Sequence, residues 1–311
     1  MANTPGLIAI VGATATGKTA LAVRLAQELG GEIVGADSRQ VYRHMDIGTA
    51  KPTAEQFSVV PHHLFDIVDP DEPYSLALFL RQARAVIADI HGRGRLPLLV
   101  GGTGQYVWGL LEGWQVPEVP PAPELRAELE ARAAADGGEA LYAELRTADP
   151  DAADRIDSRN VRRVIRALEV HAAPGRASDS APRRIAPDFN TMIVGLRLDR
   201  VELYGRVDCR VDQMLHAGWV DEVKGLLQRG YAPELSSMSG LGYRELCQHI
   251  QGEITLEDAA EAAKRRIRRF ARQQHAWFRE TDERIKWHNA DEAGLDRAAT
   301  QVRDWVLGAG G

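Results

Sequence analysis

The string GATATGKT, from Gly12 to Thr19, holds the residues best suited to chemistry in this chain. It follows an apolar run and precedes a helical pattern, the context that the phosphate-binding motif GxxxxGK followed by Ser or Thr requires. In such a loop, successive backbone N–H groups and a helix N-terminus face a polyphosphate. Lys18 would add a point charge, and the Thr19 hydroxyl would ligate Mg²⁺. The predicted site for a di- or triphosphate comprises Gly12, Ala13, Thr14, Ala15, Thr16, Gly17, Lys18 and Thr19.

Asp37 is the second candidate group, because it directly follows the apolar run Glu32 to Ala36. A side chain there should project at the carboxyl end of a parallel sheet, where ligands bind in open α/β folds. The run Leu96 to Val100 continues into Gly101 to Gly104 and offers no acid. Three roles are open to Asp37: Mg²⁺ ligand, general base toward an acceptor, or N-cap of a following helix.

Short apolar runs bounded by glycine are the expected strands that position these groups, and helical patterns separate the first three. The helical patterns cover Ala20 to Leu29 and Leu76 to Ile90. This alternation is typical of an α/β fold, here a P-loop NTPase-like parallel sheet flanked by helices. The four runs are Leu7 to Val11, Glu32 to Ala36, Leu96 to Val100 and Thr191 to Leu198.

The alternation stops after Trp114, where Val116 to Pro123 carries four prolines and cannot continue regular structure. The following residues are rich in Ala, Leu, Glu and Arg, as helices are, and Pro174 to Pro187 is a polar loop-like stretch. We predict an inserted all-helical domain over 119–188 and a catalytic core over 1–118 and 189–311. Arg206 to Gln228 and Leu256 to Arg279 should be further helices of the core.

Composition favours a globular protein: the chain has 311 residues, ordinary apolar and charged fractions, and a net charge of −6. No apolar stretch approaches membrane-spanning length or forms a signal peptide, so no membrane partner and a cytoplasmic location are expected. Two distant cysteines suggest neither a disulfide framework nor a zinc finger, and a monomer is expected. The net charge argues against indiscriminate nucleic-acid binding, yet Arg155 to Arg166 and Lys264 to Arg279 are locally basic.

Several strings, in order along nearly the whole chain, closely resemble the tRNA dimethylallyltransferases, also called tRNA isopentenyltransferases. The phrase from Asp37 to Lys51 is the most specific of them. The strings are ATATGKT, ADSRQVYRHMDIGTAKP, PHHLFDIVDPDEPYS, GRLPLLVGGTGQY, RRVIRALEV, RVDQML and GYRELCQHIQGEI.

The resemblance implies transfer of the dimethylallyl group from dimethylallyl diphosphate to N6 of an adenosine, with release of pyrophosphate. The acceptor would be the adenosine immediately 3′ of the anticodon, in the anticodon stem-loop of tRNAs that read codons beginning with U. The P-loop would then hold pyrophosphate rather than ATP, with Mg²⁺ as cofactor. An adenine amino group is a poor nucleophile, so a base that removes its proton assists the attack.

Residue roles follow from the resemblance at matching positions. Asp37 matches the family's general base, Thr103 a residue placed against the reacting amine or the diphosphate, and Arg210 an arginine near the pyrophosphate. Ser38, Arg39 and Gln40 match residues that contact the anticodon loop. The target adenosine would have to swing out of its stack into the protein, as in other base-modifying enzymes.

Two basic segments are expected to contact tRNA phosphates. On Lys264 to Arg279, helical spacing puts Ile267, Phe270, Ala271, Gln274, Trp277 and Phe278 on one apolar face. The cationic residues fall largely on other faces, without compensating acids. DSRNVRR, at Asp157 to Arg163, departs from the family's HPNDPQR, which leaves its contacts open. The candidate arginines are Arg159, Arg162, Arg163 and Arg166 in the insertion, and Arg265, Arg268, Arg269 and Arg272 in the core.

Three other functions compete with tRNA prenylation. A small-molecule kinase would use ATP at the same P-loop, with Asp37 as its base. A non-catalytic RNA-binding module would have no need of Lys18, Thr19 and Asp37 together. An adenylate prenyltransferase would use the same chemistry on AMP, but the basic segments and the insertion suit a large polyanionic acceptor better.

Overall fold

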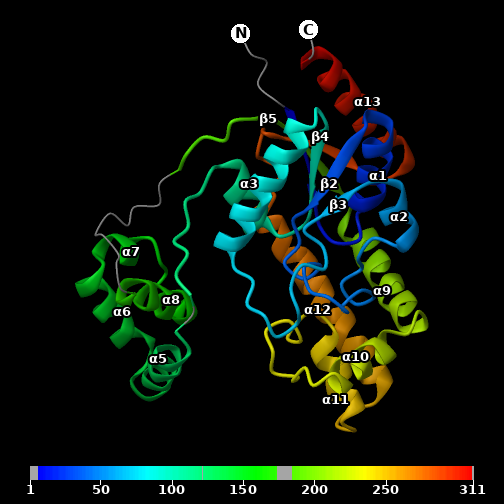
Figure 1. Ribbon diagram of the computed structural model, residues 1–311. Coiled ribbons are helices and arrows are strands. Elements are labelled where there is room, and N and C mark those ends of the chain that lie inside the picture. The colour runs from blue at the N-terminus through cyan, green and yellow to red at the C-terminus, as the bar shows by residue number, and fades with distance from the viewer. Residues whose placement is uncertain (1–5, 121, 174–183, 310–311) are drawn as a thin grey trace. The chain divides into compact units, whose positions relative to one another are not determined.

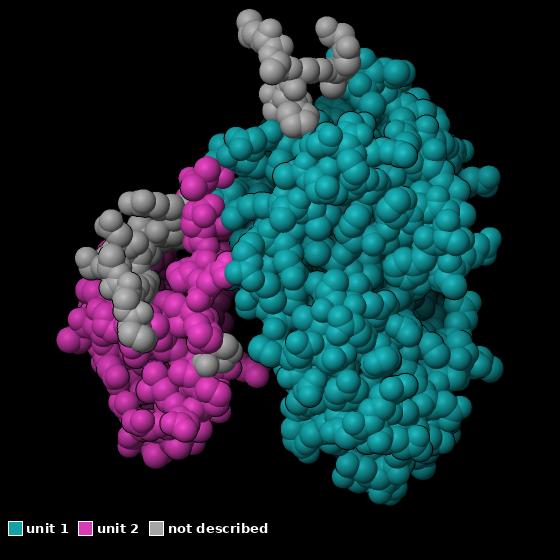
Figure 2. Space-filling view, viewed as in Figure 1, with its two compact units in different colours: residues 1–113, 186–311 teal, residues 114–185 magenta. Residues whose placement is uncertain are grey.

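The computed structural model describes residues 6–120, 122–173 and 184–309. Their contacts divide the chain into two compact units (Figure 2). Unit 1 comprises the described residues up to Gly113 and from Ala186, and unit 2 comprises Trp114–Ile185. Unit 2 begins and ends earlier than the 119–188 predicted for the insertion, and an antiparallel bridge between Trp114 and Arg184 joins its two ends. Most of the loop predicted at Pro174 to Pro187 lies outside the described residues.

Unit 1 is built on a six-stranded parallel sheet with the order β3-β2-β4-β1-β5-β6. The four predicted strands are confirmed. The strand Leu96–Val100 has the predicted bounds, and the other three differ from the prediction by one residue at each end. The two outer strands, β3 and β6, were not predicted. The strands are β1 (Gly6–Gly12), β2 (Gly31–Gly35), β3 (His62–His63), β4 (Leu96–Val100), β5 (Asn190–Arg197) and β6 (Ile285–Asn289).

Helices cover both faces of this sheet. Figure 1 shows α1 (Lys18–Leu29) and α13 (Glu292–Ala309) on one side of the strands and α3 (Leu76–Gly92) on the other. The predicted spacing of apolar residues in α3 accounts for its packing, because Leu80, Ala83 and Ile87 are buried. Its start is fixed by Ser75, whose side chain accepts a hydrogen bond from the Leu78 backbone N–H at 3.2 Å. Two short helices extend this covering: α2 (Ala54–Val59) contacts α1, and α4 (Gly104–Leu111) contacts α3.

A second core lies among the helices that follow β5. Its buried side chains include Val211, Trp219, Tyr243 and Leu246. The helical structure predicted over Arg206 to Gln228 is confirmed, but it is divided between two helices at Gly218, whose φ of 98° lies in the left-handed region. The helices are α9 (Arg200–His216), α10 (Trp219–Gln228), α11 (Tyr243–Ile250) and α12 (Leu256–Trp277).

Unit 2 has its own core of apolar side chains, which includes Leu129, Leu145 and Val164. Beside it, the carboxylate of Glu169 accepts hydrogen bonds from Arg126 and Arg166 at 2.6 and 3.3 Å. Charge pairing of this kind offsets the cost of burying a carboxylate. The helices of unit 2 are α5 (Pro123–Asp136), α6 (Gly138–Ala148), α7 (Pro150–Asp154) and α8 (Val161–Ala172).

In the described part of the chain, the helices are all too short or too polar to cross a membrane.

Candidate active site

Three predicted segments meet at the carboxyl edge of the sheet, because β1 and β2 both pair with β4. The P-loop follows β1, Asp37 follows β2, and the glycines from Gly101 follow β4. Backbone hydrogen bonds continue beyond the strand ends: the Ala36 N–H donates to the Val100 carbonyl at 2.8 Å, and the Thr103 N–H donates to the Ala36 carbonyl at 3.3 Å. These bonds fix the three segments side by side.

The P-loop has the backbone shape that a phosphate cradle needs. Gly12 has a φ of 143°, and a Cβ there would lie 2.4 Å from the Leu196 carbonyl oxygen, so only glycine fits. The buried Thr16 hydroxyl donates to the Ala13 carbonyl at 2.9 Å and stiffens the loop. Helix α1 then begins at Lys18 with no acidic residue in its first turn, which keeps its N-terminus attractive to anions.

A deep pocket in unit 1 opens beside this loop. It holds about 1110 Å³ of space free of protein atoms, part of it open to solvent. Of the eight residues predicted for the phosphate site, Thr14, Lys18 and Thr19 line it, while the other five belong to the loop backbone around it. The walls opposite are mainly apolar and include Val207, Met214, Leu241, Ile267 and Phe270. The pocket therefore combines an anion-binding end with an apolar space.

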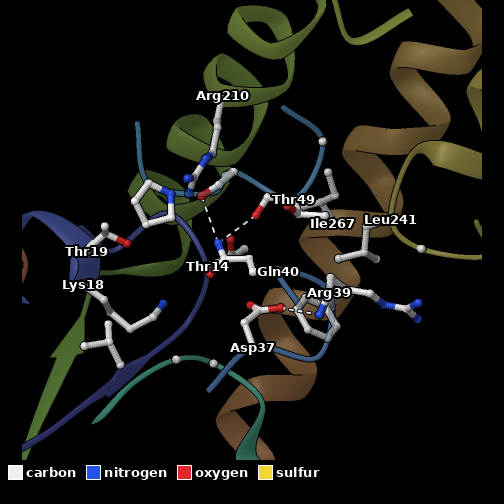
Figure 3. A pocket seen from close by; sticks show the side chains of 18 of the residues that line it. Thr14, Lys18, Thr19, Asp37, Arg39, Gln40, Thr49, Arg210, Leu241 and Ile267 are labelled. Atoms are coloured by element: carbon white, nitrogen blue, oxygen red, sulfur yellow. Dashed lines mark hydrogen bonds between the residues drawn. The ribbon is translucent and has the colours of Figure 1, made fainter. Parts of the chain in front are cut away.

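Two cations reach this pocket from different elements (Figure 3). Burial, and after it the nearby Arg210 guanidinium, lower the pKa of Lys18 to about 8 against the opposing effect of Asp37. Burial also lowers the pKa of Arg210, and Asp37 again opposes this. Among the described residues, no hydrogen-bond partner is found for the Arg210 side chain. The two charges face a space that an anion can fill.

Asp37 lines the same pocket as Lys18 and Arg210. One carboxylate oxygen, Oδ1, accepts a hydrogen bond from the Arg39 backbone N–H at 2.8 Å, which closes a turn. The residues after Asp37 form turns rather than a helix, and α2 has its own N-cap in Thr53, so a helix N-cap role for Asp37 is wrong. Of the three roles open to Asp37, those of Mg²⁺ ligand and general base are compatible with this geometry.

Thr103 lies next to the pocket rather than in its wall. Its hydroxyl oxygen accepts a hydrogen bond from the Ser38 backbone N–H at 3.0 Å, and the hydroxyls of these two residues are 3.4 Å apart. Thr103 thus ties the loop after β4 to the residue that follows Asp37. A direct contact of Thr103 with substrate stays a prediction.

Arg39 and Gln40 line the pocket, but both also serve the fold. The Arg39 guanidinium donates to the Ser236 carbonyl at 2.7 Å. The Gln40 side-chain amide donates to the carbonyls of Thr49 and Ala50 at 3.0 and 2.9 Å. Because its N–H groups are engaged there, Gln40 has only its amide oxygen to offer to a ligand.

Glu222, which shapes the pocket from α10, was not predicted from the sequence. Its carboxylate accepts hydrogen bonds from three consecutive backbone N–H groups, those of Asp46, Ile47 and Gly48, at 2.7, 2.6 and 3.1 Å. The Tyr243 hydroxyl donates to the same carboxylate at 2.7 Å. Gly48 and the two residues after it line the pocket, so Glu222 holds part of its wall in place.

His62 is a second pocket residue that the sequence did not single out, although it lies in the string PHHLFDIVDPDEPYS. Its Nδ1 lies 2.8 Å from the Val60 carbonyl oxygen, which favours a proton on Nδ1. Burial lowers the pKa of the His62 side chain, which favours the neutral form of the ring. Its buried Nε2 has no partner among the described residues.

On α12, the structure separates the four predicted tRNA-binding arginines into two kinds. Arg268 is paired with Asp208 at 3.1 Å. The other three, Arg265, Arg269 and Arg272, are exposed, and no described residue bonds to their side chains. The expected apolar face is present except at Trp277, which is 39 % exposed.

The arginines predicted in the insertion divide in the same way. Arg159 pairs with Asp157 at 2.7 Å, and Arg166 bonds to Glu169 and to the Val119 carbonyl. Arg162 and Arg163 are exposed, and within 6–120, 122–173 and 184–309 their side chains have no partner.

The donor set of the pocket fits Mg²⁺. No group of three or more His, Cys, Asp or Glu side chains is assembled for a metal anywhere in the described residues. Mg²⁺, however, is commonly held by one or two protein oxygens together with substrate phosphates and water. The Thr19 hydroxyl and the Asp37 carboxylate, both in the pocket wall, are oxygens of this kind.

Comparison with known proteins agrees with this geometry. Residues 40–281 match the family described as IPP transferase, and residues 5–63 match the one described as isopentenyl transferase. The tRNA dimethylallyltransferase of Roseiflexus sp. (strain RS-1) is 54% identical over 301 residues, which is 96% of this chain and 98% of the relative. That of Dehalococcoides mccartyi is 43% identical over 98% of this chain and 94% of its own.

Solved structures give the same result. The tRNA isopentenylpyrophosphate transferase of Bacillus halodurans matches with a TM-score of 0.71 and 42% identity, over 98% of this chain and 96% of its own. A eukaryotic dimethylallyltransferase acting on tRNA matches with a TM-score of 0.81 and 28% identity, over 98% of this chain and 80% of its own.

Proposed function

This chain belongs to the IPP transferase family, whose members prenylate adenosine in tRNA, and we propose that its donor is dimethylallyl diphosphate and its acceptor atom is N6 of the adenosine immediately 3′ of the anticodon. One observation carries this proposal: a phosphate loop, a carboxylate and an apolar space share a single pocket. The tRNAs concerned are those that read codons beginning with U.

In the proposed reaction, the bond between C1 of the dimethylallyl group and the diphosphate oxygen breaks, and a bond from N6 to C1 forms. Negative charge accumulates on the departing pyrophosphate. Lys18 and Arg210, both partly buried in the pocket wall, are placed with the P-loop amides to stabilise that charge. The apolar residues of the opposite wall suit the five-carbon chain.

The N6 amine must lose a proton as the new bond forms, and Asp37 is the proposed acceptor of that proton. Its fixed turn with Arg39 keeps the carboxylate beside the phosphate loop. The adenine must leave its stack to reach a pocket of this depth, as in other enzymes that modify bases.

Thr19 would hold Mg²⁺ against the diphosphate. When bound, the ion supplies positive charge that stabilises the leaving pyrophosphate.

The test is a transfer assay with labelled dimethylallyl diphosphate and three parallel reactions, containing unmodified tRNA, AMP or no acceptor. We expect label in the tRNA alone, at the adenosine 3′ of the anticodon. Label in AMP but not in tRNA would contradict the proposal in favour of an adenylate prenyltransferase. Tighter binding of Mg²⁺-ATP than of dimethylallyl diphosphate would favour a kinase.

A further inference from the structure

The side chain of Gln274 joins the two loops that form the anion-binding end of the pocket. It projects from α12, is only 4% exposed, and lines the pocket. Its Oε1 accepts a hydrogen bond from the Thr14 backbone N–H in the P-loop at 2.8 Å. Its Nε2 donates to the Gly102 carbonyl, in the loop after β4, at 2.9 Å. One amide thus bonds both loops at once.

This pair of bonds requires a side chain that has both a donor and an acceptor. The P-loop offers a donor and the loop after β4 offers an acceptor, so the bridging group needs one acceptor and one donor, which Gln provides. An apolar side chain would leave a buried N–H and a buried carbonyl without partners. An ionised carboxylate would satisfy the Thr14 N–H but would set a negative oxygen against the Gly102 carbonyl.

The fit around the bridge is tight. A Cβ at Gly102 would lie 2.2 Å from Nε2 of Gln274, so the loop backbone can approach the amide only because residue 102 is glycine. The bond to Gln274 also withdraws the Thr14 N–H from the set of P-loop amides that a diphosphate can use. The remaining amides of the loop are held in a fixed position relative to the rest of the pocket.

We propose that Gln274 is a positioning residue that locks the P-loop to the loop after β4 and thereby sets the affinity of the pocket for the diphosphate. This inference rests on the proposed function, since it takes the P-loop as the diphosphate site. Gln274 acts on the diphosphate through the backbone of Thr14 and not by contact with the reacting atoms.

The probe is inorganic pyrophosphate with Mg²⁺, whose dissociation constant is measured by calorimetry on the full-length protein without tRNA. We expect Gln274→Met to raise this constant by about 10- to 100-fold, the effect of leaving buried polar groups unpaired. Gly102→Ala should act in the same direction, because its methyl group displaces the amide.

Gln273→Met is the matched control. Gln273 is the neighbouring glutamine on the same helix, but it is exposed, and no described residue bonds to its side chain. Its variant should bind pyrophosphate within about twofold of the wild type, as expected of a surface substitution.

Gln274→Glu separates a hydrogen-bond bridge from simple packing. When its carboxyl group is protonated, it has one donor and one acceptor and can replace the amide; when ionised, it cannot. Burial raises the pKa of such a carboxyl, so the affinity of this variant for pyrophosphate, relative to wild type, should recover as the pH falls by about two units from about 7.5. The other ionisable groups of the pocket are common to both proteins and cancel in that ratio; they are Lys18, Asp37, Arg39, His62, Arg210 and Tyr243.

Wild-type affinity in both Gln274 variants would overturn the inference. Equal weakening in both, without recovery at low pH, would also overturn it, since packing alone would then explain the loss. Lys18→Ala tests the diphosphate site independently. If that variant binds pyrophosphate as well as the wild type does, the proposed function fails at this site, whatever Gln274 does.

Discussion

At the scale of single residues, the proposed chemistry of the pocket depends on a few charged side chains that are partly buried. Lys18 and Arg210 supply positive charge, and Asp37 supplies a carboxylate in the same pocket. Each can be altered with little change in volume, so their roles in binding and in chemistry can be separated.

Replacing Asp37 by Asn keeps the shape of the side chain and removes the base. We expect Asp37→Asn to bind dimethylallyl diphosphate and tRNA within a few-fold of wild type, while the rate of the prenyl transfer step falls by about 10²- to 10⁴-fold. Single-turnover assays at saturating substrates measure that rate. A variant with a normal transfer rate would exclude Asp37 as the general base.

The lowered pKa of Lys18, about 8, predicts how diphosphate binding depends on pH. Below that pH the free protein carries the ammonium that an anion needs. Above it the ammonium is lost, and binding must take up a proton, so the affinity should fall by up to about tenfold per pH unit.

Dissociation constants of dimethylallyl diphosphate between about pH 7 and pH 9.5 test this expectation. Lys18→Arg should remove the decline, because a guanidinium keeps its charge over this range. An equal decline in both proteins would assign the effect to another group.

At the scale of elements, the carboxyl edge of the sheet fixes where the loops start, and side chains from the helices fix the loops themselves. Glu222 on α10 holds the segment from Asp46 to Gly48, and Gln40 holds the next two carbonyls. Carboxylate bonds to several N–H groups are among the stronger hydrogen bonds in proteins. The pocket wall is therefore sensitive to a residue outside the pocket.

Glu222→Gln should lower the free energy of unfolding by about 1 to 3 kcal/mol, because its amide N–H group would face backbone donors. Prenyl transfer should fall as well, since Gly48 and Ala50 line the pocket. Denaturant titration and transfer assays measure the two effects. The control is Asp221→Asn on the same helix, where an exposed carboxylate pairs with Lys224 at 3.4 Å and the loss should be below about 0.5 kcal/mol. Equal losses in both variants would contradict this account.

The exposed face of α12 predicts unequal effects among its arginines. Replacing Arg265, Arg269 or Arg272 by Ala should weaken tRNA binding and lower its log–log dependence on salt by about 0.7 to 1 per residue. Arg268→Ala should change the slope less, because Asp208 already neutralises that guanidinium. Filter binding at several salt concentrations gives the slopes. An equal change in the salt slope for all four variants would contradict the distinction between the exposed arginines and the paired Arg268.

At the scale of the whole molecule, catalysis and the insertion occupy separate units. All residues that line the pocket belong to unit 1, and unit 2 has a core of its own. The diphosphate site should therefore form without the insertion. The expected monomer and the tRNA contacts of Arg162 and Arg163 stay predictions.

Replacing Trp114–Ile185 by a flexible Gly/Ser linker tests this independence. We expect the shortened protein to fold, to bind dimethylallyl diphosphate within about threefold of wild type, and to lose most of its tRNA affinity, because the four candidate arginines of the insertion are removed. Circular dichroism, calorimetry and filter binding measure the three properties. Loss of diphosphate binding in a folded protein would show that unit 1 needs unit 2.

The sequence alone determined the features that depend on neighbouring residues. The P-loop string, the four buried runs and helices such as α3 are local patterns, since backbone conformation and burial period are recorded in consecutive residues. For the same reason the place of Asp37, directly after a buried strand, could be predicted.

Only the tertiary structure decided which distant groups meet. Gln274 lies 260 residues from Thr14 and 172 from Gly102. Helical spacing placed it on the apolar face of its helix, but no local pattern indicates which distant loops its amide joins. Likewise, Asp208 neutralises Arg268 but not Arg269, and Glu222 reaches a loop 174 to 176 residues away. Such pairings depend on how the helices pack around the sheet, and this packing is a property of the whole chain.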